Sequence, residues 1–538
     1  MEKQSRLTYV KNIILPGILL SAITGIFTGV MIFAFKVSSG FVIEKSAEIY
    51  GFIRSDYTRL LWFVPAICCL GVIAGVILKY SPHCRGGGIP TAVSILRGLI
   101  HFNWIRSVFF VFISSLITYA AGVPLGNEGP SVQIGTALGK GTVRLFAKKQ
   151  KAWDRYVMTG GACAGFAVAT GAPISGVFFA LEEAHRRFSP MIVTVAITSV
   201  ISAMFTSELL CTALGVNISS LGIPAQAILE MKYFWSVIAV GLFCGLFAAL
   251  LAKGFHVLHK FMKHTLERLS TVIKIASVFI AVALIGVISY DCVGDGHVLL
   301  HEIFENSTVW YLLIAYLVLR VILLIVANNA GVTGGLFIPT LLFGAIIGSL
   351  CAKAFIGVGL LPEKYYTLLV VIGMAALLGS SVRTPITAII FALEAMSGLQ
   401  NVVYFALGVA VAYIVVEMLR VESINDIVIG YKLAEENKGK TMRVVDTYVT
   451  VKEGAFAVGK ETRDVFWPQS CVVLSIKKNN KAHTRRESGG IHVGDILHVH
   501  YLTTDTALTH RELCAIVGEQ EYNDIGESSD LHPPGHME

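Results

Sequence analysis

Long apolar runs dominate this chain of 538 residues and leave few folds open to it. A helix of about 20 apolar residues crosses the hydrocarbon core of a bilayer, and several runs reach that length. Only 15% of the residues are charged, whereas soluble proteins carry about a quarter. The runs cover residues 12–36, 60–78, 104–123, 156–181, 190–213, 232–252, 309–328, 341–360, 366–379 and 402–419. This pattern predicts an all-α polytopic membrane protein.

Three glycine-rich segments with a proline interrupt the apolar sequence: Gly86–Pro90, Gly126–Pro130 and Gly334–Pro339. At membrane depth, broken helices are tolerated where they are buried or line a cavity, and in transporters they mark the binding site. Helix N-termini carry free N–H groups and partial positive charge, which favour an anion. We therefore expect the three segments to aim helix N-termini at one anion near the midplane.

Glu128 lies between the glycines of the second segment, directly before Gly129-Pro130. A proline suits the first turn of a helix, so a helix is expected to begin here and to run to about Phe146. A tethered carboxylate at this N-terminus would compete with a free anion for the same N–H groups. Such competition would make an anion gate that responds to protonation.

A second carboxylate feature, Glu182-Glu183, ends an apolar helix directly before His185-Arg186-Arg187. A helix end that emerges into cytoplasm explains one of these glutamates without any function. The helix from Gly129 to Phe146 would span roughly 27 Å, which places Glu128 towards the outer side and Glu183 towards the inner side. Because buried ionisable residues in membranes mark ion paths and proton relays, Glu183 is a candidate proton site.

Basic residues cluster at Lys3–Lys11, Arg144–Lys151, His185–Arg187 and Lys253–Lys274 and contribute to a net charge of +7. The clusters flank apolar runs, so the positive-inside rule places these loops and both termini in the cytoplasm. Nucleic acid is not needed to explain them. The first apolar run has no cleavage site and is interpreted as a membrane segment, not a signal peptide. Ten scattered cysteines give no metal or disulfide spacing. No catalytic nucleophile and base stand out, so no enzyme activity, cofactor or metal is expected.

Two stretches of the membrane region resemble each other. Gly161–Glu183 aligns without gaps to Gly373–Ala395, with identical residues that include Pro173 and Pro385. Upstream, Pro130-Ser131 and two following glycines match Pro339-Thr340 and two glycines at the same spacing. Transporters are often built from two such halves, with substrate bound between them. The predicted membrane domain is residues 1–432, with halves near 10–220 and 230–432.

The character of the chain changes after residue 432. Residues 433–440 form a short charged linker, and residues 441–520 alternate as strands do at 443–451, 471–476 and 496–501. A helix is expected at 507–517. These residues predict a small α+β domain that is soluble and, by the topology above, cytoplasmic. The tail at 521–538 has the composition of a disordered segment.

On these residues the chain resembles the CLC family of chloride channels and chloride/proton antiporters. The motifs GGGIP, GNEGP and GGLFIP occur in the family's order, and PISGVFFALEE resembles its inner-glutamate helix. The resemblance implies about 18 helices, many broken, in two inverted repeats, and a homodimer with one pore per subunit. It also implies that Glu128 is the external gating glutamate and Glu183 the internal proton glutamate. The anion would contact Gly87 and Gly88 in the first loop and the backbone amides of Phe337 and Ile338.

Three positions depart from the family pattern. Gly87 replaces a serine, Asn127 replaces a basic residue, and Asn425 stands at the position of the family's central tyrosine. Two side-chain hydroxyl contacts to chloride are therefore changed. The first hypothesis is a proton-coupled chloride antiporter gated by Glu128, in a bacterial plasma membrane. A passive chloride channel and a fluoride/proton exporter are the alternatives.

The C-terminal domain resembles the C-terminal regulatory domain of potassium-uptake regulators of the Trk/RCK type. The resemblance rests on Val451–Gly459, a strand at Cys471–Lys477, and Gly494–Val499. Such domains pair across a dimer and often bind a small ligand, in some bacteria cyclic di-AMP. The alternative is a module that only stabilises the dimer. A further hypothesis is a membrane sensor whose main output is ligand binding by residues 441–520.

Overall fold

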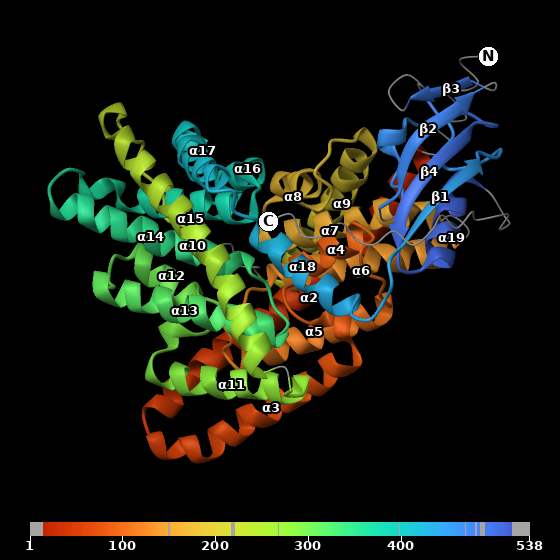
Figure 1. Ribbon diagram of the computed structural model, residues 1–538. Helices are drawn as coiled ribbons and strands as arrows, with labels where there is room; N and C mark the ends of the chain where they lie inside the picture. Colours follow the sequence, from red (N-terminus) through yellow and green to blue (C-terminus); the bar gives the residue numbers. More distant parts are fainter. Residues whose placement is uncertain are drawn as a thin grey trace.

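The computed structural model is mostly helical, as the apolar runs predict, and carries a small sheet near its C-terminal end (Figure 1). It describes residues 14–148, 151–216, 221–266, 268–396, 399–468, 470–478, 481–484 and 490–518. The predicted tail at 521–538 and the basic cluster Lys3–Lys11 lie outside the described residues.

Eight helices follow one another in the first half of the chain: α2 (Leu15–Arg54), α3 (Leu60–Tyr80), α4 (Gly88–Leu96), α5 (Trp104–Ala120), α6 (Glu128–Phe146), α7 (Asp154–Thr170), α8 (Pro173–Phe179) and α9 (Pro190–Leu214). The second half repeats the series: α10 (Phe234–Leu266), α11 (Thr271–Ile288), α12 (His297–Phe304), α13 (Trp310–Ala330), α14 (Phe337–Gly357), α15 (Tyr366–Val382), α16 (Pro385–Ala395) and α17 (Val402–Met418). Helix α18 (Ile424–Glu436) follows, so the first four residues of the predicted linker are helical.

Nine helices in the described residues are long and apolar enough to cross a membrane, which agrees with a multi-pass membrane protein. One of them, Thr271–Ile288, was not among the ten predicted runs, because its basic flank was interpreted as a loop. The predicted run 156–181 divides into α7 and α8. Gly171 has a φ of 71° at the end of α7, a conformation that glycine adopts readily, and Pro173 then begins α8.

Equivalent helices in the two halves pack in the same pairs. Helix α6 packs on α7 as α14 packs on α15, and α2 packs on α9 as α10 packs on α17. The closest approaches also correspond: a Cβ on Gly135 would lie 2.1 Å from the carbonyl oxygen of Gly161, and one on Gly344 would lie 2.3 Å from that of Gly373. Any larger residue would force these helices apart, so the matched glycines are explained by packing. The halves join where α3 packs on α11 and α8 on α16.

The C-terminal region forms a four-stranded antiparallel sheet in the order β1-β4-β2-β3. The strands are β1 (Arg443–Thr450), β2 (Val472–Lys478), β3 (Lys481–Thr484) and β4 (Ile496–Thr503), and helix α19 (Thr506–Val517) follows. The three predicted strands and the predicted helix are confirmed; β3 was not expected. Alternate residues of β1, such as Val445 and Val449, are buried in a core of its own beneath α19.

Candidate functional site

The three glycine-rich segments meet, although the chain separates them widely. Gly87 pairs with Gly334 as an isolated parallel bridge, and Gly126 pairs with Gly335 as an antiparallel one. The N–H of Gly335 donates to the carbonyl of Gly126 at 2.7 Å, and the reverse bond is 2.9 Å. The N-termini of α4, α6 and α14 are thereby held at one place in the buried interior.

Glycine is required at this crossing because backbone touches backbone. A Cβ on Gly88 would lie 2.1 Å from the carbonyl carbon and oxygen of Gly129, and one on Gly129 would lie 2.7 Å from the Cα of Gly335. The N–H of Gly88 donates to the carbonyl of Gly334 at 3.2 Å. Gly88 was predicted to contact the anion, and this stays a prediction; in the structure its N–H is engaged within the protein, and the absence of a side chain permits the crossing.

Glu128 is the first residue of α6, as the motif predicted, and its side chain is only 3% exposed. Its Oε2 lies 2.7 Å from where a Cβ on Gly126 would be, next to the Cβ of Ile338. That oxygen has no hydrogen-bond partner among the described residues. A carboxylate oxygen therefore lies between the N-termini of α6 and α14, in surroundings that would also suit a free anion.

Sequence reasoning missed the charges around Glu128. The residues whose charges act on its carboxylate are Lys36 of α2, His297 of α12 and Asp295. The Lys36 ammonium also donates to the carbonyl of Ala169 at 2.6 Å. The signal available in the sequence was Lys36 itself, a single lysine at the end of the first apolar run, 12–36. Its relation to Glu128 could not be inferred, because nothing in the sequence pairs α2 with α6.

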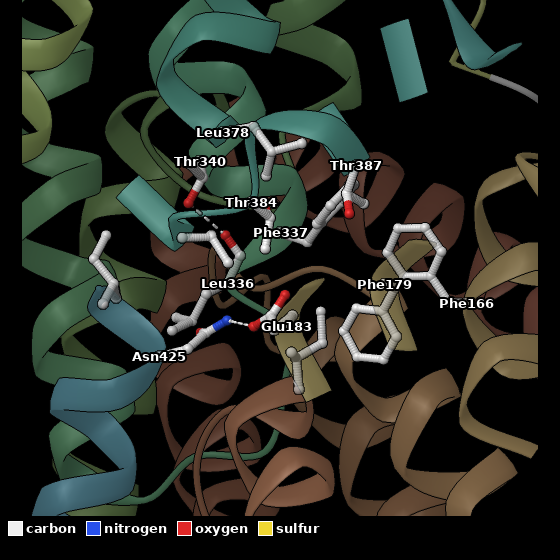
Figure 2. Close-up of a pocket in the computed structure, with 13 residues that line it drawn as sticks. Phe166, Phe179, Glu183, Leu336, Phe337, Thr340, Leu378, Thr384, Thr387 and Asn425 are labelled. Carbon is white, nitrogen blue, oxygen red and sulfur yellow. Dashed lines mark hydrogen bonds between the residues drawn. The ribbon is translucent and has the colours of Figure 1, made fainter. Parts of the chain in front are cut away.

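A cavity lies at the N-terminus of α14 (Figure 2), lined by Ile89, Phe166, Phe179, Glu183, Leu336, Phe337, Thr340, Leu378, Val382, Thr384, Thr387, Ile424 and Asn425. Of the predicted site residues, the lining includes Glu183, Phe337 and Asn425. Ile338 instead faces Glu128, and Gly87 lies behind Leu336. Leu336 and the three threonines were not expected there. The cavity walls are mostly apolar, with few polar groups.

Glu183 and Asn425 lie next to each other in the lining of this cavity (Figure 2), and the Asn425 amide donates to Oε1 of Glu183. Glu183 is 7% exposed and lies in the π-helical turn Ala180–Ala184 that follows α8. Arg97 holds the turn from outside: its guanidinium donates to the carbonyl oxygens of Glu183 at 2.8 Å and Ala184 at 3.1 Å. The sequence placed Asn425 on the anion; in the structure its amide contacts the proton-site candidate.

The neighbouring Glu182 has a different environment. Its carboxylate accepts the backbone N–H groups of Ile386 at 3.0 Å and Thr387 at 2.7 Å, at the start of α16. Glu394 does the same at the start of α8, where it accepts the N–H groups of Ile174 and Ser175. Carboxylates are favoured at helix N-termini. Glu182 and Glu394 are aligned in the internal repeat. Glu182 of the first half therefore caps α16 of the second half, and Glu394 of the second half caps α8 of the first.

Gly87 stands where the family pattern has a serine, and a polar side chain of another helix lies beside it. A Cβ on Gly87 would be 3.3 Å from Nδ2 of Asn328 at the end of α13. Asn328 is 8% exposed, and its Nδ2 has no hydrogen-bond partner among the described residues. An amide donor thus lies next to the position that lacks a hydroxyl.

The described residues thus form a multi-pass helical membrane protein with one buried carboxylate, Glu128, at converging helix N-termini. The family model described as "Voltage gated chloride channel" matches residues 70–417, which span α3 to α17. The chain belongs to this family.

Similar proteins include the H(+)/Cl(-) exchange transporter ClcA of Salmonella arizonae and that of Salmonella paratyphi B. Each is 24% identical over 430 residues, which cover 78% of this chain and 89% of the relative. These relatives are exchange transporters, and the chain is not an enzyme.

Solved structures share the fold. A slow cyanobacterial Cl-/H+ antiporter superposes with a TM-score of 0.71 at 22% identity, over 78% of this chain and 99% of that one. A CLC-type fluoride/proton antiporter gives 0.61 at 23% identity, over 74% and 95% of the two chains. A eukaryotic CLC transporter gives 0.64 at 18% identity, over 78% and 74%.

Proposed function

We propose that this chain is a chloride/proton antiporter in which Glu128 gates the anion path and Glu183 passes the proton. The carrying observation is that a buried carboxylate, Glu128, occupies the meeting point of helix N-termini, where an anion would be bound. Similarity to exchange transporters at 24% identity supports the same function.

The proposed mechanism is a competition. When Glu128 is ionised, its carboxylate faces the N-termini of α6 and α14 and excludes the anion. Protonation removes the charge that these N-termini favour, so the side chain leaves and chloride takes its place near Phe337 and Ile338. Glu183 supplies or accepts the proton from the other end of the cavity, and the Asn425 amide orients its carboxylate.

The test is transport by the purified protein in liposomes, followed with a chloride electrode and a pH probe. Wild-type protein should move protons against their gradient when chloride flows down its own. Glu183→Gln should lower the proton flux by about a hundredfold, a typical loss for a proton-transfer group, and should leave the chloride flux unchanged. Glu182→Gln is the matched control, because its carboxylate caps α16 and should not affect the proton flux.

Unchanged proton flux in Glu183→Gln would remove Glu183 from the mechanism. Chloride flux without proton movement in the wild-type protein would instead identify a passive channel, the second hypothesis from the sequence.

Fluoride/proton export is the competing candidate. It is favoured by Gly87, which offers no hydroxyl to a chloride ion, and by the similarity of the fold to a fluoride/proton antiporter. Efflux of fluoride and chloride from the same liposomes separates the two. Chloride efflux much faster than fluoride efflux supports the first proposal, and the reverse order supports export of fluoride.

For the C-terminal domain we propose regulation by a small ligand such as cyclic di-AMP, in a homodimer with both termini in the cytoplasm. Support comes from the resemblance of residues 451–459, 471–477 and 494–499 to Trk/RCK-type domains. Adding cyclic di-AMP to the liposome assay tests the ligand. An unchanged flux would leave the domain as a dimer-stabilising module.

A further inference from the structure

The C-terminal domain contacts the membrane region through α19, which packs on the turn at residues 151–153, and through residues 452–468 between β1 and β2, here named the docking loop. It is tied to its own domain: the N–H of Lys452 donates to the carbonyl of Val517 at 2.9 Å, and that of Gly459 to Ile491 at 2.8 Å. In Figure 1 the sheet domain lies beside α7 and α6. The docking loop is therefore bonded to its own domain and packs its aromatic residues on the membrane region.

Phe466 is the most enclosed aromatic contact of the docking loop. It is 5% exposed, and its ring centroid lies 4.3 Å from that of Tyr156 and 4.4 Å from that of His185. The guanidinium groups of Arg187 and Arg155 lie 4.4 Å and 4.9 Å from the ring centroid. Cations near an aromatic face are attracted to it, so the ring is fixed by several groups of the membrane region at once.

His185 connects this contact to the candidate proton site. Its N–H donates to the carbonyl of Ala180 at 3.1 Å and so closes the π-helical turn that contains Glu183. Its ring is hydrogen-bonded to the hydroxyl of Thr159 at 2.7 Å and lies against Phe466. The histidine is thus held between α7 and the docking loop, two residues after Glu183.

A second contact reaches the same turn from the other side. Arg155 donates to the carbonyl of Trp467 in the docking loop at 2.5 Å and to the carbonyl of Leu96 at 2.9 Å. Arg97, which directly follows Leu96 in the chain, donates to the carbonyls of Glu183 and Ala184. Both paths are continuous chains of direct contacts from the docking loop to Glu183.

We propose that Phe466 is a positioning residue: through His185, the docked C-terminal domain holds the turn Ala180–Ala184 and so sets the position of Glu183. The inference rests on the proposed function, in which Glu183 passes the proton. Phe466 is not among the residues that line the cavity. Its loss should therefore change how many protons move per chloride, and not abolish the anion path.

The test uses the full chain in liposomes and three variants. Phe466→Ala removes the ring, and Phe466→Tyr keeps it. Phe456→Ala is the matched control, because Phe456 docks on Trp153 and Tyr156 at 5.3 Å and 5.5 Å between ring centroids and is not in ring contact with His185. Two quantities are measured: the ratio of proton to chloride flux, and deuterium exchange of the backbone amides of residues 180–187.

Phe466→Ala should lower the flux ratio about threefold or more, the scale on which mutations along a chain of contacts modulate coupling between separate sites, and should speed exchange in residues 180–187. Phe466→Tyr should restore both quantities, and Phe456→Ala should change them less. Wild-type values of both in Phe466→Ala would overturn the inference, and so would equal effects of the two alanine variants. If the wild-type protein moves no protons, the antiport proposal fails, and the exchange measurement alone decides whether Phe466 holds the turn.

Discussion

Lys460 in the docking loop has a buried amine whose environment predicts a pH effect. It is 3% exposed, and its Nζ lies 2.8 Å from the ring centroid of Phe456 without a hydrogen-bond partner among the described residues. Burial lowers the pKa of Lys460 to about 6, and the nearby charge of Asp464 offsets only part of this effect. At neutral pH the folded protein therefore favours the neutral amine.

The sign of the effect follows from the two states. In the unfolded chain a lysine has a pKa of about 10.4, so the unfolded state binds more protons than the folded state between about pH 6 and pH 10. Stability rises with pH wherever the unfolded state binds more protons. Below about pH 6 both states are protonated, and Lys460 causes no further change.

We expect Lys460→Met to raise the melting temperature of the purified chain at pH 7, by about 5 °C for the domain that contains it. The variant should also flatten the rise of melting temperature between pH 6.5 and pH 9. Tryptophan fluorescence during heating at each pH measures both. Lys452→Met is the control, since Lys452 is exposed. A pH dependence that persists unchanged in Lys460→Met would assign it to another group.

At the scale of elements, the short helices α8 and α16 depend on each other's glutamates. Glu182 accepts two N–H groups and the Thr387 hydroxyl at 2.7 Å from α16, whereas Glu394 accepts two N–H groups from α8. A hydrogen bond to a charged group contributes about 1.5–3 kcal/mol. These reciprocal hydrogen bonds therefore stabilise the contact between the two halves at the N-termini of α8 and α16.

Glu182→Ala and Glu394→Ala should each lower the melting temperature, and Glu182→Ala should lower it more because it loses one additional bond. Thermal unfolding in detergent measures this. Glu208→Ala, on an exposed position of α9, should stay within about 0.5 kcal/mol of wild-type stability. Equal stability of all three variants would mean that water replaces the caps without cost.

These elements also mark what sequence reasoning could reach. The repeat, the helix start at Glu128 and the strands follow from local patterns, because proline, glycine and apolar spacing act on nearby residues. Glu183 was singled out with the help of the family resemblance, and local pattern alone does not separate it from Glu182, since their partners, Asn425 and Thr387, lie 242 and 205 residues away. The hydrogen bond of Asn425 and the docking of Phe466 depend likewise on tertiary contacts that no local pattern encodes.

At the scale of the whole molecule, the candidate site belongs entirely to the membrane region. The cavity lining runs from Ile89 to Asn425, and Glu128 lies within that span. The C-terminal domain contributes none of these residues, and it has its own core. It covers Trp153, Tyr156 and His185 with the aromatic residues of the docking loop. Stability and anion transport should therefore respond differently to its removal.

A chain that ends at Lys440 should keep anion flux and lose thermal stability. The flux persists because the cavity and Glu128 remain, and stability falls because burial of each large apolar side chain contributes about 2 kcal/mol. Liposome flux and the melting temperature of the truncated chain test both parts. The full chain with Val493→Ala, an exposed position of the domain, is the control. A truncated chain that stays folded but carries no anion would contradict this expectation. It would show that the anion path needs the C-terminal domain, although no residue of that domain lines the cavity.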